Sequence, residues 1–158
     1  FITITSNGML LSEQICRGLI ANPYLKAFSF SFDGARKETV ESIRRGIDYR
    51  RVVDNMRVLG ALKGKRRGRF PLLNIRFAAM KRNIEELPDL VKFAREIGFD
   101  KVSVNYLNVT GSIEKDESLL YHAQSAASAF REASRIAREK KIWLELPEAP
   151  AMRERQAL

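Results

Sequence analysis

The hydrophobic pattern of this chain alternates between two periods. Runs rich in β-branched and aromatic residues predict strands at 1–5, 27–32, 72–79, 101–108 and 142–146. The segments between them carry apolar residues three and four positions apart, which predicts helices at 13–21, 39–43, 52–64, 87–97 and 126–137. Two strands joined through a helix pair in parallel, by a right-handed crossover. The sequence therefore predicts an α/β fold, with a parallel sheet and helices outside it.

Two architectures share this order of elements, namely a doubly wound sheet and an arc of a (β/α) barrel. In both, ligand-binding groups gather at the carboxyl ends of the strands. Two predicted strands run into Asn7-Gly8 and Asp33-Gly34, and polar ends of this kind favour the barrel-like arrangement. We therefore expect a partial (β/α) barrel of the TIM type over residues 1–147. Residues 148–158 are expected to be a tail or the start of a lost extension.

The composition is that of a globular protein, with 45% hydrophobic and 30% charged residues. No run approaches the roughly 18 to 20 apolar residues that a membrane span needs. The single cysteine, Cys16, excludes an internal disulfide, a thiolate zinc site and an iron–sulfur cluster held by the thiolates of this chain alone. Because Cys16 falls in a helical pattern without a cysteine partner, we expect it to be buried as a small apolar residue.

The strand ends are rich in hydroxyl and amide side chains. They read Thr5-Ser6-Asn7-Gly8, Ser31-Phe32-Asp33-Gly34 and Asn105-Tyr106-Leu107-Asn108. Such groups on one rim suit a polar ligand with many hydrogen-bonding groups, and the glycines allow close approach of the backbone. The simpler alternative is that Asn-Gly and Asp-Gly form good turns after strands.

At these positions the chain resembles the radical S-adenosylmethionine (SAM) enzymes. The segment 5–11 is similar to the T-x-N-G-x-L-L segment after their third barrel strand, and 31–34 is similar to the S-x-D-G segment after the fourth. Glu38, Thr39 and the run 43–46, with Asn55 beyond it, resemble the helix that follows, and 83–98 resembles the segment after the fifth strand. The likeness covers residues 1–147 and is greatest to the SPASM-type and molybdenum-cofactor-type subgroups.

The resemblance implies roles for three strand-end or helix-end residues. Ser31 would hydrogen-bond the SAM ribose or carboxylate, and Leu107 would pack against the adenine. Arg44 would pair with the SAM carboxylate, a task that suits a planar guanidinium. Arg45 is the alternative for that role, because the doubled arginine leaves the register open.

The resemblance also implies roles for three residues near the SAM and substrate sites. Thr5 would face the substrate, while Asn7 and Asp33 belong to the cofactor-binding segments and order their own loops. A general-base role for Asp33 has no paired carboxylate or histidine nearby in sequence to support it. The acidic residues Glu85, Glu86 and Asp89 are explained by the positive end of the helix dipole.

Two segments of the family are absent from this chain. They are the Cys-x-x-x-Cys-x-x-Cys motif that holds the [4Fe–4S] cluster and the Gly-Gly-Glu-Pro segment that holds the SAM amino group. The resemblance therefore implies a fragment of a larger cytoplasmic enzyme, inactive alone. Its full-length form would cleave SAM reductively to a 5′-deoxyadenosyl radical and act on a small molecule or a peptide. Exposed sheet edges in such a fragment would favour oligomerisation.

The basic charge offers a second interpretation. The chain has 28 Lys and Arg against 19 Asp and Glu, a formal charge of +9. Five of these cations crowd one predicted loop, Lys63–Arg69, which is most simply a solvated loop. The alternative is a stand-alone basic α/β module that binds nucleic acid or an acidic partner through this loop. No aromatic residues interleave with the cations, so nucleic acid is the less expected partner.

Overall fold

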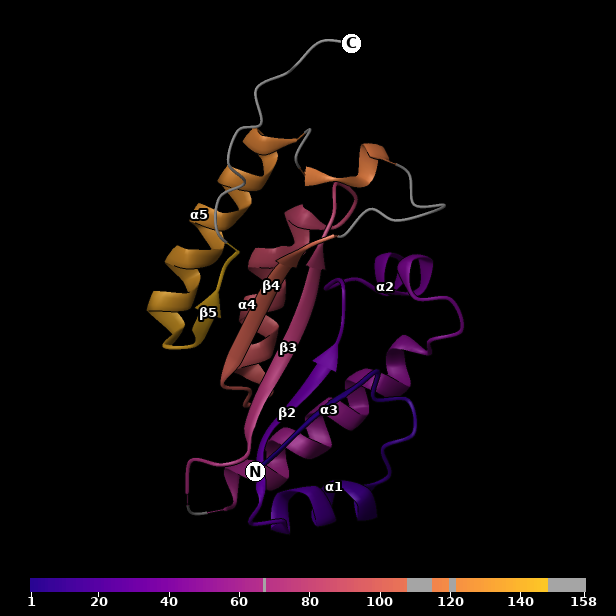
Figure 1. Ribbon diagram of the computed structural model, residues 1–158, viewed down its shortest axis with the longest axis vertical. Helices are drawn as coiled ribbons and strands as arrows, with labels where there is room; N and C mark the ends of the chain where they lie inside the picture. Colours follow the sequence, from indigo (N-terminus) through magenta and orange to yellow (C-terminus); the bar gives the residue numbers. More distant parts are fainter. Residues whose placement is uncertain (67, 108–114, 120–121, 148–158) are drawn as a thin grey trace.

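The computed structural model describes residues 1–66, 68–107, 115–119 and 122–147, and in them it contains one five-stranded parallel sheet (Figure 1). The strands are β1 (Ile2–Ser6), β2 (Leu25–Ser31), β3 (Leu72–Ala79), β4 (Lys101–Tyr106) and β5 (Trp143–Glu145). They lie in the order β1-β2-β3-β4-β5, which is their order in the sequence. A doubly wound sheet reverses its strand order at a switch point. The unreversed order is that of an arc of a (β/α) barrel, so the predicted fold class is confirmed.

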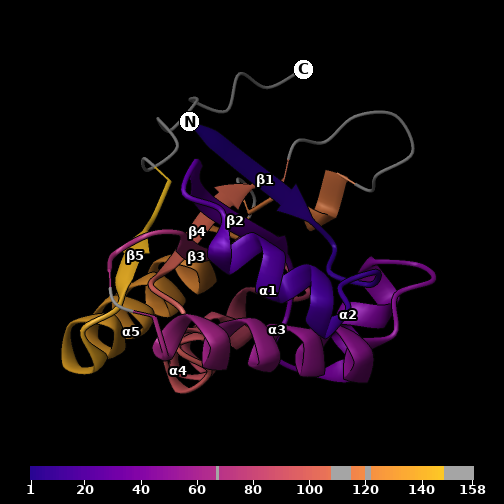
Figure 2. The same cartoon turned by 90° about the horizontal axis from the view of Figure 1, so that it is seen from below.

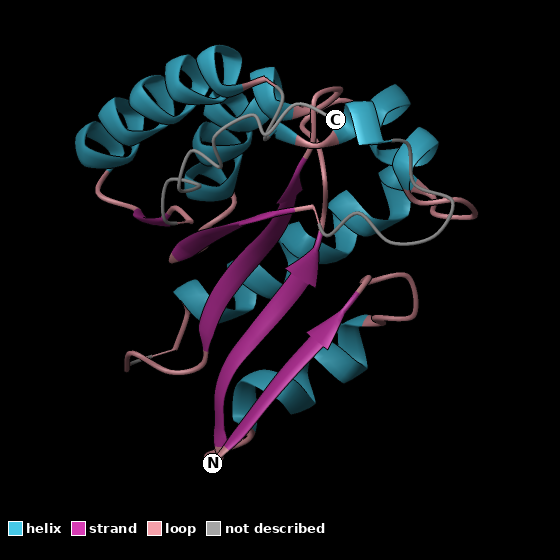
Figure 3. Ribbon diagram, turned by 45° about the horizontal axis from the view of Figure 1, so that its top comes forward, coloured by secondary structure: helices cyan, strands magenta, loops and turns pink. Residues whose placement is uncertain are grey.

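The helices follow the strands in the expected alternation. They are α1 (Glu13–Ala21), α2 (Lys37–Ile43), α3 (Tyr49–Gly64), α4 (Leu87–Glu96) and α5 (Ala123–Lys140), with short 3₁₀ turns η1 (Ile84–Glu86) and η2 (Lys115–Glu117). Seen from below, α1, α3 and α4 lie on one face of the sheet (Figure 2). Among the described residues, no helix covers the other face of the sheet (Figure 3). We call this uncovered face the inner face, because it would line the interior of a closed barrel.

Local signals in the sequence explain where the helices begin. The hydroxyl oxygen of Ser12 accepts a hydrogen bond from the backbone N–H of Ile15 at 3.2 Å, which caps α1. The carboxylate of Asp48 accepts one from the N–H of Arg51 at 3.0 Å and caps α3 in the same way. None of the helices in the described residues combines the length and the apolarity needed to cross a membrane.

The core lies between the sheet and the helices. Alternation along β3 turns Leu73, Ile75 and Phe77 toward the helices, where they are fully buried. Aromatic rings fill the space beside them, with the ring centres of Phe28 and Phe30 5.2 Å apart in an edge-on arrangement. Cys16 is fully buried in this core, as expected, and burial raises the pKa of its thiol.

One helix contact depends on a glycine. A Cβ atom at Gly60 of α3 would lie 1.8 Å from the carbonyl oxygen of Ile97, so only glycine allows this approach between α3 and the end of α4. Gly98 follows with a φ of +80°, in the left-handed conformation that ends many helices.

The last predicted strand is shorter than expected. Ile142 is not part of β5, because its N–H bonds to the carbonyl of Ala137 and so belongs to the turn that closes α5. Lys141 makes this turn with a φ of +54°. Strand β4 ends at Tyr106, where its ladder with β3 ends at Ala79. The predicted strand residue Asn108 and the predicted tail 148–158 lie outside the described residues.

Candidate functional site

Asp33, just beyond the end of β2, connects two strand ends and a helix. Its side chain is 3% exposed. Its Oδ1 accepts a hydrogen bond from the backbone N–H of Ala78 in β3 at 2.7 Å, and its Oδ2 pairs with Nη2 of Arg44 at 2.7 Å. Burial raises the pKa of the Asp33 carboxyl, and the effect of burial is larger than the opposing effects of these two partners. Sequence reasoning had given Asp33 a role within its own loop; its contacts extend to β3 and to the end of α2.

Arg44 is placed by the end of α2 and by Asp33. It is the residue at which the helix stops, and its N–H bonds to the carbonyl of Val40 at 2.9 Å. Its side chain is 31% exposed, so part of the guanidinium reaches the surface. Within the described part of the chain, the buried Nε of Arg44 has no hydrogen-bond partner. A buried N–H donor of this kind is costly unless another group accepts from it.

Arg44 lines a cavity of about 520 Å³ at the carboxyl ends of the strands. The residues that line it come from the ends of three strands, from α2 and the turn after it, and from η2. They are Asp33, Ser42, Ile43, Arg44, Arg45, Ala78, Met80, Arg82, Leu107 and Glu117. Arg82 is paired with Glu117 at 2.6 Å. Three arginines and two carboxylates line the cavity, together with apolar groups from Ile43, Met80 and Leu107. This lining suits an anionic ligand with an apolar part.

The structure brings together four of the residues singled out from the sequence. Asp33, Arg44, its alternative Arg45, and Leu107 all line this cavity. The N–H of Leu107 bonds to the carbonyl of Ala79 at 3.2 Å, which holds the chain after β4 beside the end of β3.

Three other predicted residues, Ser31, Thr5 and Asn7, do not line the cavity. Ser31 is the last residue of β2 and pairs in register with Arg76 of β3. Thr5 pairs with Ser29 and is exposed. Ser31 and Thr5 both lie near the carboxyl ends of their strands, so they share the cavity's edge of the sheet without lining it.

Asn7 orders the loop after β1. Its Oδ1 accepts a hydrogen bond from the N–H of Met9 at 3.1 Å, as expected for a residue that fixes its own turn. Asn55 of α3 holds the same loop by donating to the carbonyl of Gly8 at 2.8 Å. Gly8 has a φ of +80°, and a Cβ there would lie 2.4 Å from the ring of Phe30, so this position requires glycine.

Two buried polar residues near η1 support the site and were missed by the sequence reasoning. The first is Asn83, which is fully buried. Its Nδ2 donates to the carbonyls of Asp33 at 3.0 Å and of Ala78 at 2.9 Å, and its Oδ1 accepts from the N–H of Met80 at 2.8 Å. Asn83 therefore ties the loop after β2 to the loop after β3.

The second is Glu86, which the sequence reasoning explained only by the dipole of its own helix. It is 5% exposed, and its Oε2 accepts from the N–H groups of Ala35 at 2.8 Å and Arg36 at 3.0 Å. Its Oε1 accepts from the hydroxyl of Thr39 at 2.5 Å. The explanation by the helix dipole was therefore incomplete. Glu86 also caps the beginning of α2, the helix that ends at Arg44. No local sequence signal distinguishes it from the exposed Glu85 beside it.

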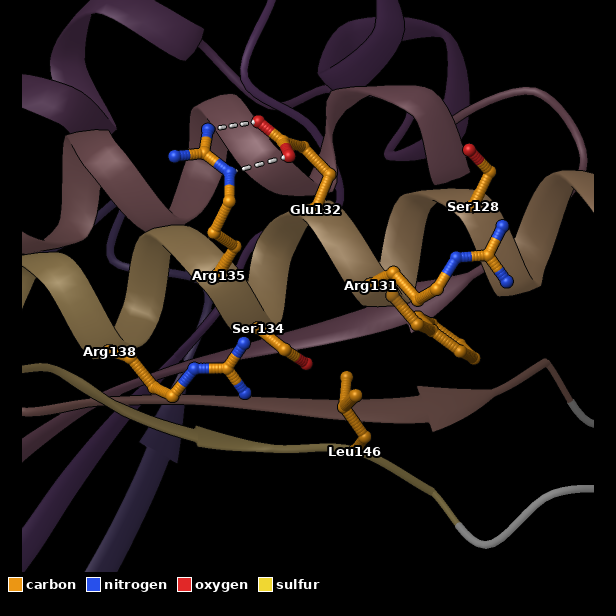
Figure 4. A pocket seen from close by; sticks show the side chains of 8 residues that line it. Ser128, Arg131, Glu132, Ser134, Arg135, Arg138 and Leu146 are labelled. Atoms are coloured by element: carbon orange, nitrogen blue, oxygen red, sulfur yellow. Dashed lines mark hydrogen bonds and ion pairs between the residues drawn. The ribbon is translucent and has the colours of Figure 1, made fainter.

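A second hollow lies beside α5, away from these strand ends. It has a volume of about 690 Å³ and is lined by residues of α5 and by Leu146 (Figure 4). Arg135 is paired there with Glu132 at 2.6 Å, and Ser134 and Arg138 are directed toward the side of Leu146. None of the site residues predicted from the sequence lines this hollow.

The basic loop before β3 is partly used within the fold. Lys63 pairs with Asp100, and the guanidinium of Arg66 donates to the carbonyl of Ile20. Lys65 and Arg69 are exposed, and Arg67 lies outside the described residues. The ion pair with Asp100 offsets the charge of Lys63, while Arg66 keeps its charge because its partner is a neutral carbonyl. In the residues that the structure describes, no group of three or more His, Cys, Asp or Glu side chains could hold a metal ion.

No family model and no curated protein matches this sequence. Solved structures do share its fold. The crystal structure of SuiB from Streptococcus suis matches 94% of this chain with a TM-score of 0.69 and 21% identity. SuiB bound to S-adenosylmethionine and SuiB bound to its precursor peptide SuiA both match with a TM-score of 0.70 over 94% of this chain, at 20% and 18% identity. The chain spans about a third of the length of these structures, 33%, 33% and 32%. At these identities the likeness establishes the fold.

Proposed function

We propose that this chain is the SAM-binding part of the barrel of a radical SAM enzyme. The observation that carries the proposal is the Arg44 guanidinium, which Asp33 holds at one nitrogen and which is partly exposed beside a cavity that Leu107 also lines. The sequence resemblance assigns a SAM carboxylate to Arg44, and SuiB, which shares the fold, has been solved with SAM bound. A carboxylate in this cavity would pair with the exposed part of the guanidinium.

The residues present fit SAM in the following way. Arg44 binds the carboxylate of SAM through the N–H groups that Asp33 leaves open, and Arg45 supplies a second, exposed cation at the same cavity. Leu107 packs against the adenine, and Ser31 at the end of β2 donates to the ribose or the carboxylate. Thr5, on the inner face, contacts the substrate. Asp33 orients the guanidinium, and Asn83 and Glu86 hold the loop and the helix that position both partners.

The same residues do not fit an iron–sulfur cluster. The only thiol of the chain belongs to Cys16, which is fully buried in the core and has a raised pKa. The cluster would be held by residues outside this chain, in a longer cytoplasmic parent protein. With one electron delivered through that cluster, SAM would supply a 5′-deoxyadenosyl radical. This chain alone binds SAM without cleaving it.

We further propose that the parent enzyme acts on a peptide. SuiB shares the fold of this chain at 18% identity, and it has been solved in complex with its precursor peptide SuiA. The inner face of the sheet is the surface available to such a substrate, because helices cover the other face. Parallel sheets are normally covered on both faces.

Calorimetric titration of SAM into the 158-residue chain tests the proposal. Arg44→Gln is expected to weaken SAM binding by about tenfold or more, because it removes a charge-assisted, two-pronged contact with the carboxylate. Arg138→Gln serves as the matched control, since Arg138 is exposed on α5 and does not line the cavity. Absence of SAM binding to the chain, or equal binding by the Arg44→Gln variant, would overturn the proposal.

A further inference from the structure

The inner face of the sheet carries a row of hydrogen-bonded polar side chains. Asn74 of β3 donates from Nδ2 to the hydroxyl of Ser29 in β2 at 3.2 Å, and its Oδ1 accepts from the hydroxyl of Ser103 in β4 at 3.2 Å. The three residues are between 6% and 9% exposed. Because they bond to one another across three strands, their side chains point to the same face, opposite to Ile75 and Phe77.

The row continues to β5 through an ion pair. Nζ of Lys101 lies 2.8 Å from Oε2 of Glu145. Hydrogen bonds from Lys101 and Ser103, together with the nearby charge of Arg76, lower the pKa of Glu145. The carboxylate on this part of the inner face is therefore ionised and already bonded to two side chains.

Arg76 is a further positively charged residue on the inner face, next to this hydrogen-bonded row. It lies two residues after Asn74 in β3, hence on the same face, and it pairs in register with Ser31 on one side and Ser103 on the other. It is exposed. In the part of the chain that the structure describes, no carboxylate is within ion-pairing distance of Arg76. Two of the charged side chains on this part of the inner face, Arg76 and Lys101, are positive, and one, Glu145, is negative. The middle of the inner face therefore carries one excess positive charge.

We propose that Arg76 binds a carboxylate of the substrate, namely an acidic side chain of a peptide that lies along the inner face. The inference rests on the function proposed above and adds to it the chemical class of the substrate. A guanidinium offers two parallel N–H donors that match a carboxylate. Glu145 is held by Lys101 and Ser103, so it does not compete for Arg76 at close range.

The test compares two peptides that differ only in charge. The probes are acetyl-Ala-Glu-Ala-amide and acetyl-Ala-Gln-Ala-amide, titrated into the 158-residue chain and followed by the backbone amide signals of β3 and β4. The chain is expected to bind the Glu peptide about tenfold more tightly than the Gln peptide, the usual contribution of a charge-assisted contact. Arg76→Gln should abolish this preference, and Arg76→Lys should keep part of it. Arg138→Gln should keep all of it.

Three results would overturn the inference: no preference for the Glu peptide, a preference that survives Arg76→Gln, or binding of sodium glutarate as tight as that of the Glu peptide. The last result would assign the site to small carboxylates. Titration of SAM into the same samples separates this inference from the proposed function. If the wild-type chain binds SAM but shows no preference between the two peptides, only the role of Arg76 is refuted. If it shows the preference but does not bind SAM, the SAM assignment is refuted.

Discussion

Oε2 of Glu86 lies 2.8 Å from the backbone nitrogen of Ala35, a residue 51 positions earlier in the chain. This contact places a buried carboxylate at the beginning of α2, where the free N–H groups and the helix dipole both favour negative charge. Gly34 makes room for it, because a Cβ at that position would lie 3.0 Å from the same oxygen. The position of α2, and of Arg44 at its end, therefore depends on a side chain from the segment that follows β3.

Replacement of Glu86 tests this dependence. Glu86→Ala removes the acceptor of three hydrogen bonds and leaves two backbone N–H groups without it, so it is expected to lower the free energy of unfolding by about 3 kcal/mol. Glu85→Ala changes the neighbouring residue, which is exposed, and should cost less than about 0.5 kcal/mol. Urea denaturation of both variants gives the comparison. Equal effects of the two replacements would show that Glu86 does not hold α2.

The pH dependence of stability tests the environment of Asp33. Because burial raises its pKa, the folded protein binds the Asp33 proton more tightly than the unfolded chain does. Its contribution to the free energy of unfolding is therefore fully present below the ordinary value of 3.8 and is lost as the pH rises through the raised folded pKa. Asp33→Asn keeps an oxygen that accepts from Ala78 and has no proton to lose. The stability of the wild type relative to this variant should fall as the pH is raised from 3.8.

Glu145 provides a control of opposite sign for that measurement. Hydrogen bonds from Lys101 and Ser103 lower its pKa, so its contribution is present above the ordinary value of 4.5 and is lost as the pH falls. The stability of the wild type relative to Glu145→Gln should rise as the pH is raised toward 4.5 and stay level above it, whereas the Asp33 difference falls from 3.8 upward. The burial argument would be contradicted if the stability of the wild type relative to Asp33→Asn were constant or rose with pH.

Two helical glycines should respond in opposite ways to alanine. Gly60→Ala places a Cβ 1.8 Å from the carbonyl oxygen of Ile97, so the backbones must separate, and we expect a loss of about 2 to 4 kcal/mol. Gly18→Ala, in the middle of α1, meets no atom within 4 Å and should stabilise the protein by about 0.5 to 1 kcal/mol. Thermal unfolding distinguishes them. A stabilising Gly60→Ala would show that α3 and α4 do not approach this closely.

The sequence analysis succeeded where the determining signals are local. The strand and helix periods predicted the order of elements, because each signal lies within a few residues of its effect. The turn formed by Asn7 is of the same kind. The polar ends of two strands also indicated the correct edge of the sheet for the cavity, since parallel strands end at a common edge.

Contacts between distant segments could not be predicted in this way. The pairing of Asp33 with Arg44 and Ala78, and the capping of α2 by Glu86, depend on how three strand ends come together. In the sequence, Glu86 has the same appearance as any acidic residue in a first helical turn. The choice between Arg44 and Arg45 was open for a related reason, because it depends on where α2 ends and on which guanidinium reaches Asp33.

The assignment of a SAM carboxylate to Arg44 is tested most directly by comparing SAM with decarboxylated SAM, which lacks only that carboxylate. Their affinities for the wild-type chain, Arg44→Gln and Arg45→Gln can be measured by calorimetry. We predict that the wild type prefers SAM by about tenfold, that Arg44→Gln removes the preference, and that Arg45→Gln retains it. Equal affinity of the wild type for both compounds, or a preference that persists in Arg44→Gln, would contradict the account.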